Sequence, residues 1–251
     1  WIWLERTDEP KPLDTLILER SVKAIQTLTA NSAFQSLDAA VRIVCDPDAS
    51  ERDRHDAAKR LGLTGVVTVV ASTTPSPAAP HTTWVGRYAV ALVAGTPVLP
   101  SDLRAGTAIA QEPTHLPAAL TGARLALRLT DKVGGPGPSL VAYDELGALA
   151  VLAKLTTPQE AGAITDVRRL DQLLVTRPWV IDTLQAVLDG VSLRQAATSL
   201  HIHHSTLQER LSWLAGRLGY AVTKPGGHQR AAVAVAFWRI AHCDDELSAD
   251  G

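Results

Sequence analysis

The segment SLRQAATSLHIHHSTLQERLSWLAGRLG, residues 192–219, predicts two short helices joined by a tight turn. Ser192 is a favoured N-cap residue, so a first helix is expected to start there and to run through Leu200. Its apolar side chains recur at the spacing of one helical face, namely Leu193, Ala196, Ala197 and Leu200. The polar and β-branched residues at 201–203 end this helix.

A second helix is expected after residues 201–203, with Ser205 or Thr206 as its cap. Leu207, Leu211 and Leu214 are spaced so that they form one buried stripe. Two helices with small residues at their crossing, joined by a turn of about three or four residues, make a helix-turn-helix pattern. The rest of the chain is therefore expected to position or control this motif.

Composition places the chain among ordinary globular proteins. Its 251 residues are 46% hydrophobic and 20% charged, which is enough for one large domain or two medium-sized ones. No apolar run approaches the ~20 residues of a membrane span, so no membrane partner is predicted. The net charge of −2 excludes a uniformly basic nucleic-acid binder. Cys45 and Cys243 lie far apart without C-x-x-C spacing, which favours neither a disulfide framework nor a zinc site and is typical of a cytoplasmic protein.

After a polar, proline-interrupted tail, helices are expected up to residue 61. Apolar periodicity predicts two helices, one near 13–30 and one near 34–43. Asp46-Pro47-Asp48 breaks the chain, and a charged helix is expected over 50–61 with Ser50 as its cap.

A section rich in β-structure is predicted next. Residues 66–70 form a buried-strand run, residues 83–93 one long strand or a hairpin, and residues 107–110 a short strand. A helix over 115–129 and a strand over 140–143 follow, and Asp144 is expected to cap a helix over 145–155. This order predicts an α+β sandwich of about 100 residues.

The chain is expected to divide into this α+β part and an all-α part. Small and polar residues over 157–164 are interpreted as the connection. Helices are then expected over 167–174, 178–188 and 227–242, with Trp179, Trp213 and Trp238 as core residues. The predicted organisation is a tail at 1–12, an α+β domain at 13–156, a linker at 157–164, a helical domain at 165–243 and an acidic tail at 244–251.

Residues 183–222, TLQAVLDGVSLRQAATSLHIHHSTLQERLSWLAGRLGYAV, resemble the C-terminal DNA-binding domain of PucR/CdaR-type bacterial transcriptional regulators. In that family a TL-x-x-x-L helix comes first, then a small-residue helix, then L-x-V-H-x-x-T-L-x-x-R-L and a helix that ends in L-G. The matching residues here are Thr183, Leu184, Leu188, Ala196, Ala197, Leu200, His201, Ile202, His203, Thr206, Leu207, Arg210, Leu211, Leu218 and Gly219.

The upstream sequence resembles the middle domain of the same family. LTGARLALRL (120–129) followed by LVAYDELGALAVLAKL (140–155) is similar to the end of that domain. The resemblance implies the α+β fold class, with a GGDEF-like α/β sandwich that lacks cyclase chemistry, followed by an all-α helix-turn-helix domain. It also implies a DNA-binding regulator, often dimeric, of catabolic or secondary-metabolism operons such as those for polyketides.

The second helix departs from the family where it would read DNA. His204-Ser205 stand where relatives commonly carry Arg-Asn or Pro-Asn, and Gln208-Glu209 stand where they commonly carry Arg-Tyr. Fewer basic residues and a new carboxylate weaken the attraction to phosphate.

The candidate DNA-binding residues lie on and around this helix, whose N-terminal part enters the major groove in such motifs. Gln208 suits a bidentate contact to adenine, and Ser205 suits a base or a phosphate. The other candidates are Arg194, Thr206, Arg210 and Arg217 for phosphates, with His203 or His204 facing the DNA. Six basic residues stand against two acidic ones between Asp189 and Ala241, a local net charge of +4.

No catalytic residue, metal site or cofactor is predicted. The H-x-H-H cluster at 201–204 lacks a Cys or acidic ligand at a suitable spacing. Gly86-Arg87-Tyr88, in the hairpin region, brings no paired carboxylates, and residues 134–138 lack the Lys-Ser/Thr of a phosphate loop. Asp144 and Glu145 are interpreted as helix-capping residues.

The sequence therefore predicts a cytoplasmic, non-enzymatic transcriptional regulator that binds double-stranded DNA. A homodimer is expected, because one motif reads too few base pairs and paired half-sites supply the rest. The α+β domain leaves room for a small-molecule effector. The alternative is a signal-binding or protein-interaction module whose helix-turn-helix has lost DNA binding; Glu209 favours it, and Arg210 with the local positive charge opposes it.

Overall fold

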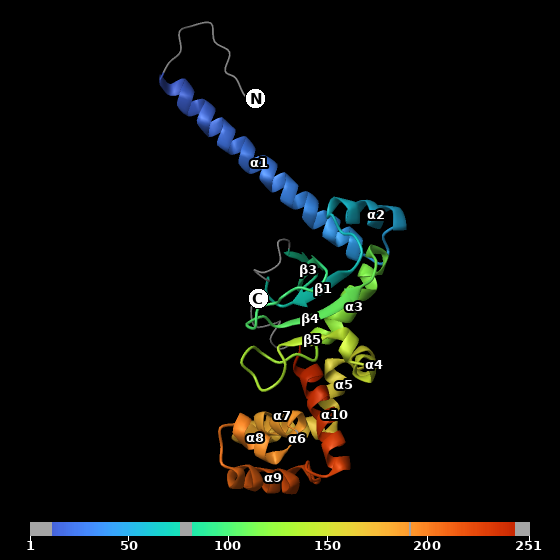
Figure 1. Cartoon of the computed structure of the whole chain (residues 1–251), viewed down its shortest axis with the longest axis vertical. Helices are drawn as coiled ribbons and strands as arrows, with labels where there is room; N and C mark the ends of the chain where they lie inside the picture. The colour runs from blue at the N-terminus through green and yellow to red at the C-terminus, as the bar shows by residue number, and fades with distance from the viewer. Residues whose placement is uncertain (1–11, 76–81, 191, 244–251) are drawn as a thin grey trace.

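The computed structural model describes residues 12–75, 82–190 and 192–243, and its arrangement is drawn in Figure 1. A five-stranded sheet and the helices around it make one part of the molecule, and a helical bundle makes the other. This mixed architecture confirms the predicted α+β class. Of the two predicted tails, 1–12 and 244–251, only Pro12 is described, and it begins a helix.

The sheet is built around its most buried strand. Its order is β2-β3-β1-β4-β5, with the strands listed by residue as β1 (Val67–Ser72), β2 (Thr82–Val85), β3 (Tyr88–Ala94), β4 (Ala105–Ala110) and β5 (Leu140–Ala142). Every residue of β1 is buried, as expected for a central strand made of Val, Ala and Thr. Only the β4–β5 pair is parallel among the pairings of the described strands.

The predicted strand region 83–93 is a hairpin. Val85 and Tyr88 face each other at its end, so Gly86 and Arg87 form a two-residue turn. Gly86 has φ +65°, a left-handed conformation that such a turn requires and that glycine adopts without strain.

One helix, α3 (Leu116–Leu127), lies directly against the sheet. Its buried residues Leu116, Leu120 and Ala123 join Val67 and Val69 of β1 in the main hydrophobic cluster. The approach is so close that a Cβ at Gly106 of β4 would overlap the carbonyl oxygen of Ala123 and the backbone nitrogen of Leu127. Gly106 therefore sets the distance between helix and sheet.

The N-terminal prediction of two helices is wrong. A single helix of 34 residues, α1 (Pro12–Cys45), replaces them and projects away from the sheet in Figure 1. Residues 13–45 contain no glycine or proline, so nothing in the sequence between the two apolar patterns stops a helix. Its last turns pack on the sheet through Val41 and Val44.

The other predicted caps had different outcomes. Ser50 does cap α2 (Glu51–Arg60), since its hydroxyl accepts a hydrogen bond from the Asp53 N–H at 3.1 Å. Asp144 caps no helix: it lies in a 3₁₀ turn (Tyr143–Glu145) ahead of α4 (Ala148–Leu155), and its carboxylate accepts from the Ile109 N–H at 3.3 Å. That prediction was wrong, because Gly147 with φ +52° starts the helix later.

The segment interpreted as a connection contains a short helix, α5 (Pro158–Ala163). Thr157 and Glu160 form a reciprocal capping box at its start. Hydrogen bonds from the Thr157 backbone N–H and hydroxyl also lower the pKa of the Glu160 carboxyl.

The remaining helices are, in order, α6 (Thr165–Thr176), α7 (Trp179–Asp189), α8 (Leu193–Ser199), α9 (His204–Leu218) and α10 (Pro225–His242). Their cores form a second cluster that includes Leu170, Leu184 and Leu214. α10 leaves this bundle and reaches α5, where Ala236 and Ile240 pack with Leu129 and Ala153. Within the described ranges, no helix combines the length and apolarity that a bilayer crossing requires.

The close contact at Gly106 makes Gly106→Ala a sharp test of the α3–sheet packing. The added methyl group meets backbone atoms, so we expect a loss of about 3 kcal/mol or more in the free energy of unfolding. Gly216→Ala is the matched control, because its Cβ would meet nothing within 4 Å in helix α9. It should gain about 0.5–1 kcal/mol. Urea unfolding followed by circular dichroism checks both, and an unchanged Gly106→Ala midpoint would contradict this packing.

Candidate nucleic-acid interface

Helices α8 and α9 form the predicted helix-turn-helix. The Ser192 hydroxyl caps α8 by accepting from the Gln195 N–H at 3.3 Å. The turn then reverses at His201, whose φ of +54° is left-handed, and the Ile202 N–H returns to the Ala197 carbonyl at 3.0 Å. Ala196 and Ala197 are buried at the crossing, as their small size allows.

The second helix begins at His204, two residues earlier than a cap at Ser205 predicts. Its N-cap is His203, whose Nδ1 accepts from the Ser205 N–H at 3.3 Å and lies 2.8 Å from the Ser205 hydroxyl. Ser205 and Thr206, predicted as caps, lie inside the first turn of α9. Histidine is an unusual cap, which explains why the sequence pointed to the nearby Ser and Thr instead.

The buried stripe of α9 is confirmed, and it determines which residues face outward. Leu207, Leu211, Leu214 and Leu218 are buried against the bundle. Ser205, Glu209 and Ser212 are exposed and lie on the opposite side of the helix by its 3.6-residue period. Figure 1 places α9 at the outer end of the bundle, remote from the sheet. The outward face of α9 is therefore accessible to a large partner.

The end of α9 is fixed to helix α6. Gly219 closes the helix in the left-handed conformation, with φ +81°. Arg169 of α6 donates to the Leu218 carbonyl at 2.8 Å. Together with the His203 cap at its start, these contacts fix both ends of α9.

One flank of α9 carries an arginine–tryptophan cluster, which comprises Arg177, Trp179, Arg210, Trp213 and Arg217. The two indole rings pack edge to face with centroids 5.4 Å apart. The Arg210 guanidinium lies 4.7 Å from the Trp179 ring, while Arg177 and Arg217 lie 6.0 and 5.6 Å from that of Trp213. Both tryptophans are half-buried. One part of each ring packs against the core, and the exposed part makes cation–π contacts with the arginines.

The structure brings most of the predicted DNA-binding residues to this end of the molecule. His203, Ser205, Gln208, Arg194 and Arg217 are exposed, and His204 and Thr206 are half-buried. Arg210 is held by α7, since it donates to the Thr183 hydroxyl at 3.3 Å in addition to stacking on Trp179. Gln208 lines the opposite flank with Leu193 of α8.

Arg177 is the residue that sequence reasoning missed. It lies between α6 and α7, outside the periodic patterns, and only the fold brings it to Trp213. The position of Arg177 before Pro178 gave no signal of a role at α9.

Behind the motif, α7 is joined to the sheet part by a buried polar contact. Arg239 of α10 donates to the Gln185 amide oxygen at 2.7 Å and lies 3.9 Å from the Asp131 carboxylate. Burial lowers the pKa of the Arg239 guanidinium, against the opposite effect of Asp131 and Asp189. A Cβ at Gly137 would overlap this guanidinium, so the glycine-rich loop leaves space for it.

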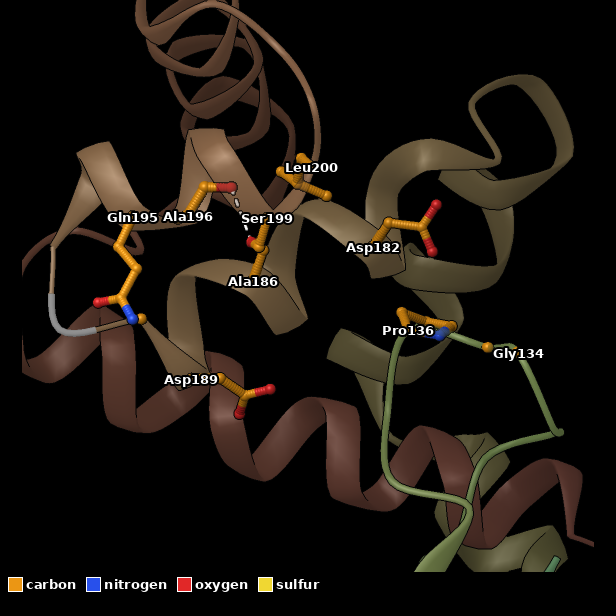
Figure 2. Close-up of a pocket in the computed structure, with 11 residues that line it drawn as sticks. Gly134, Pro136, Asp182, Ala186, Asp189, Gln195, Ala196, Ser199 and Leu200 are labelled. Carbon is orange, nitrogen blue, oxygen red and sulfur yellow. Dashed lines mark hydrogen bonds between the residues drawn. The ribbon is translucent and has the colours of Figure 1, made fainter. Parts of the chain in front are cut away.

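A cavity of about 480 Å³ lies beside this contact, between the glycine-rich loop and helices α7 and α8 (Figure 2). Asp182 and Asp189 point toward it from α7, and Gln195 borders it from α8. The described residues that line it include no lysine or arginine.

In the described part of the chain, no group of three or more His, Cys, Asp or Glu side chains could hold a metal ion. Burial raises the pKa of the Cys45 thiol to about 12, which keeps it protonated and unreactive.

Comparison with known families now adds to this geometry. The family model described as the PucR C-terminal helix-turn-helix domain matches residues 180–237, from the start of α7 into α10. Residues 180–237 form a PucR-type helix-turn-helix domain. The predicted resemblance is confirmed for this part of the chain, and it supports DNA binding and transcription regulation as the class of function.

Two further comparisons add little. Among the curated proteins no match to the sequence is found. The crystal structure of a regulator of polyketide synthase expression from Bifidobacterium adolescentis is similar at 17% identity, over 82% of this chain and 92% of that one, with a TM-score of 0.30. A likeness at this TM-score carries no argument about fold or function.

The role of His203 as the cap of α9 is tested by comparing a substitution that removes the acceptor with one that keeps an acceptor. His203→Ala leaves the Ser205 N–H without its acceptor and should lower the free energy of unfolding by about 1 kcal/mol. His203→Asn supplies another acceptor and should leave the free energy of unfolding unchanged. His55→Ala, at an exposed position within α2, is the control. Urea unfolding measures all three, and equal loss in His203→Ala and His203→Asn would contradict the capping role.

Proposed function

We propose that this chain is a DNA-binding transcriptional regulator of the PucR/CdaR type that acts on a catabolic or secondary-metabolism operon. The observation that carries the proposal is the PucR-type helix-turn-helix domain, whose second helix is rigidly held and presents an exposed face at the outer end of the molecule. A rigid helix with one accessible face is what insertion into a major groove requires.

The residues proposed to contact DNA are distributed over three sides of α9. Ser205 and Gln208 reach base edges from its first turns, as their hydrogen-bonding side chains allow. Arg217 and Arg210 serve the phosphates on the flank of the arginine–tryptophan cluster, and Arg194 serves them beside α8. Thr206, His203 and His204 complete the set around the start of the helix.

Glu209 opposes DNA binding by α9. Its exposed carboxylate lies in the outward stripe and repels phosphate. The alternative function, a signal-binding or protein-interaction module without DNA affinity, draws its support from this residue. The cations of the arginine–tryptophan cluster favour the regulator, because they are held at one flank of the same helix.

We propose that the chain divides at 13–156 and 165–243, with 157–164 between them. Separate hydrophobic clusters support this division, one around the sheet and one among α6 to α10. The sheet part is proposed as the GGDEF-like regulatory domain, acting without catalysis in the cytoplasm.

A second copy of the chain is the proposed partner along α1. Leu16, Ile17 and Val22 are 38–45% exposed on the part of the helix that projects from the body. Leu18, Val22 and Ile25 follow each other at spacings of four and three residues, the pattern of a coiled-coil seam. A dimer would supply the two half-site readers that operator recognition needs.

DNA binding is tested with the promoter region of the protein's own operon, using fluorescence anisotropy over a range of salt concentrations. Gln208→Ala should weaken promoter binding by about tenfold through the loss of a base contact. Arg217→Ala should weaken binding to every duplex and reduce the salt slope by about 1. Arg217 is a cleaner choice than Arg210, because Arg210 also bonds Thr183.

Two further variants each remove a negative charge, one on α9 and one, as the control, in the sheet part. Glu209→Gln should strengthen binding to any duplex, whereas Glu145→Gln, an exposed acid in the sheet part, should change nothing. If Gln208→Ala, Arg217→Ala and Glu209→Gln all leave promoter affinity unchanged, the chain is not a DNA-binding regulator of this kind. The interaction module without DNA affinity is then favoured.

The dimer proposal predicts that Val22→Glu yields monomers, because it places like charges opposite each other in the seam. Val98→Glu is the control, since Val98 is 94% exposed on the loop after β3. Sedimentation velocity measures both variants against the unaltered chain. A monomeric unaltered chain, or a dimeric Val22→Glu variant, would overturn this assignment.

A further inference from the structure

A second pocket, in the sheet part, has the opposite character to the cavity behind the motif. It has a volume of about 360 Å³ and lies between α3, the β2–β3 turn and the end of α4. Among the described residues, four basic side chains and no Asp or Glu line it: Arg87, Arg124, Arg128 and Lys154. We call it the cationic pocket.

Three separate elements bring these charges together. Arg124 lies in α3, and Arg128 is the C-cap residue of the same helix, four residues further on and on the same side. Arg87 comes from the hairpin turn, and Lys154 from the last turn of α4. Like charges gathered from three elements repel one another unless an anion lies among them.

The two arginines of α3 are positioned by neutral oxygens. Arg124 donates to the Val85 carbonyl at 3.1 Å and its guanidinium lies 5.0 Å from the Tyr88 ring. Arg128 donates to the Ala153 carbonyl and, at 2.7 Å, to the Thr156 carbonyl. Carbonyl groups fix the direction of a guanidinium but leave its charge uncompensated.

The described residues do not satisfy every donor of these cations. The Arg124 Nε is buried without a hydrogen-bond partner among them. Lys154 is exposed and forms no hydrogen bond or ion pair with any described residue. The nearby acid Glu160 already accepts from the Thr157 N–H and hydroxyl at 2.8 Å.

We propose that the cationic pocket binds a small organic anion, a carboxylate or phosphate carried on an apolar body. The charged group would lie between Lys154 and Arg124. The apolar body would lie along Leu125, Leu155 and Pro158, which also line the pocket. The pocket reaches Thr156 and Thr157, directly before α5, so the ligand would contact the chain segment that leads to the helix-turn-helix domain.

The test uses the full chain and three probes of similar size: phenyl phosphate, benzoate and neutral benzyl alcohol. Isothermal titration calorimetry at constant ionic strength should give one site per chain for at least one anion and none for the alcohol. Which anion binds distinguishes a phosphate ligand from a carboxylate. This measurement requires no DNA, so its result tests the ligand proposal separately from the proposed function.

Matched variants locate the site. Lys154→Glu should raise the Kd of the bound anion by at least about tenfold, the worth of one charge-assisted hydrogen bond. Lys59→Glu, the same change on exposed α2, should leave it unchanged. Unaltered circular dichroism and Tm verify that both variants fold. Failure of both anions to bind, equal binding by Lys154→Glu, or equal binding of benzyl alcohol would overturn the proposal.

Discussion

Helix α10 is the element on which the arrangement of this molecule depends. Its first half packs in the helix-turn-helix bundle, and its second half packs with Leu129 and Ala153 in a third cluster, so it links the bundle to the sheet part. Arg239 lies where the two meet, bonded to Gln185 of α7 and facing Asp131 of the sheet part. A buried cation of this kind is tolerated only when its partners stay in place, so the contact specifies one relative position of the two parts.

The DNA-facing surface combines a rigid frame with an unusual charge pattern. The caps at His203 and Gly219 and the Arg169 contact hold α9, while the arginine–tryptophan cluster presents cations along one flank. Glu209 stands in the middle of the outward stripe. In the proposed function, the positive charge at the flank would anchor phosphates from the side, and the central carboxylate would favour bases that tolerate Glu209.

The two pockets differ in charge because their walls come from different elements. The cavity behind the motif is lined by Asp182 and Asp189 of α7, whereas the cationic pocket is lined by arginines of α3 and Lys154. The first borders the α7–α8 frame and the second borders the segment before α5.

Local patterns were enough to predict the helix-turn-helix, the buried stripe of α9, the strands and the α+β order, because each depends on side-chain periodicity and caps within a few residues. The same patterns failed where a local signal was ambiguous. Two apolar patterns in α1 were read as two helices, Asp144 was assigned a capping role, and Ser205 or Thr206 was preferred to His203.

Only the tertiary structure decided which residues distant in sequence make contact. Arg177 meets Trp213, Arg239 meets Gln185 and Asp131, and Arg87, Arg124 and Lys154 share one pocket. Their separations in sequence carry no periodic signal, since they arise from how helices and hairpin pack rather than from what any one segment prefers. The sequence by itself determined which elements form and which family the C-terminal domain resembles; packing decided which of their charged side chains meet.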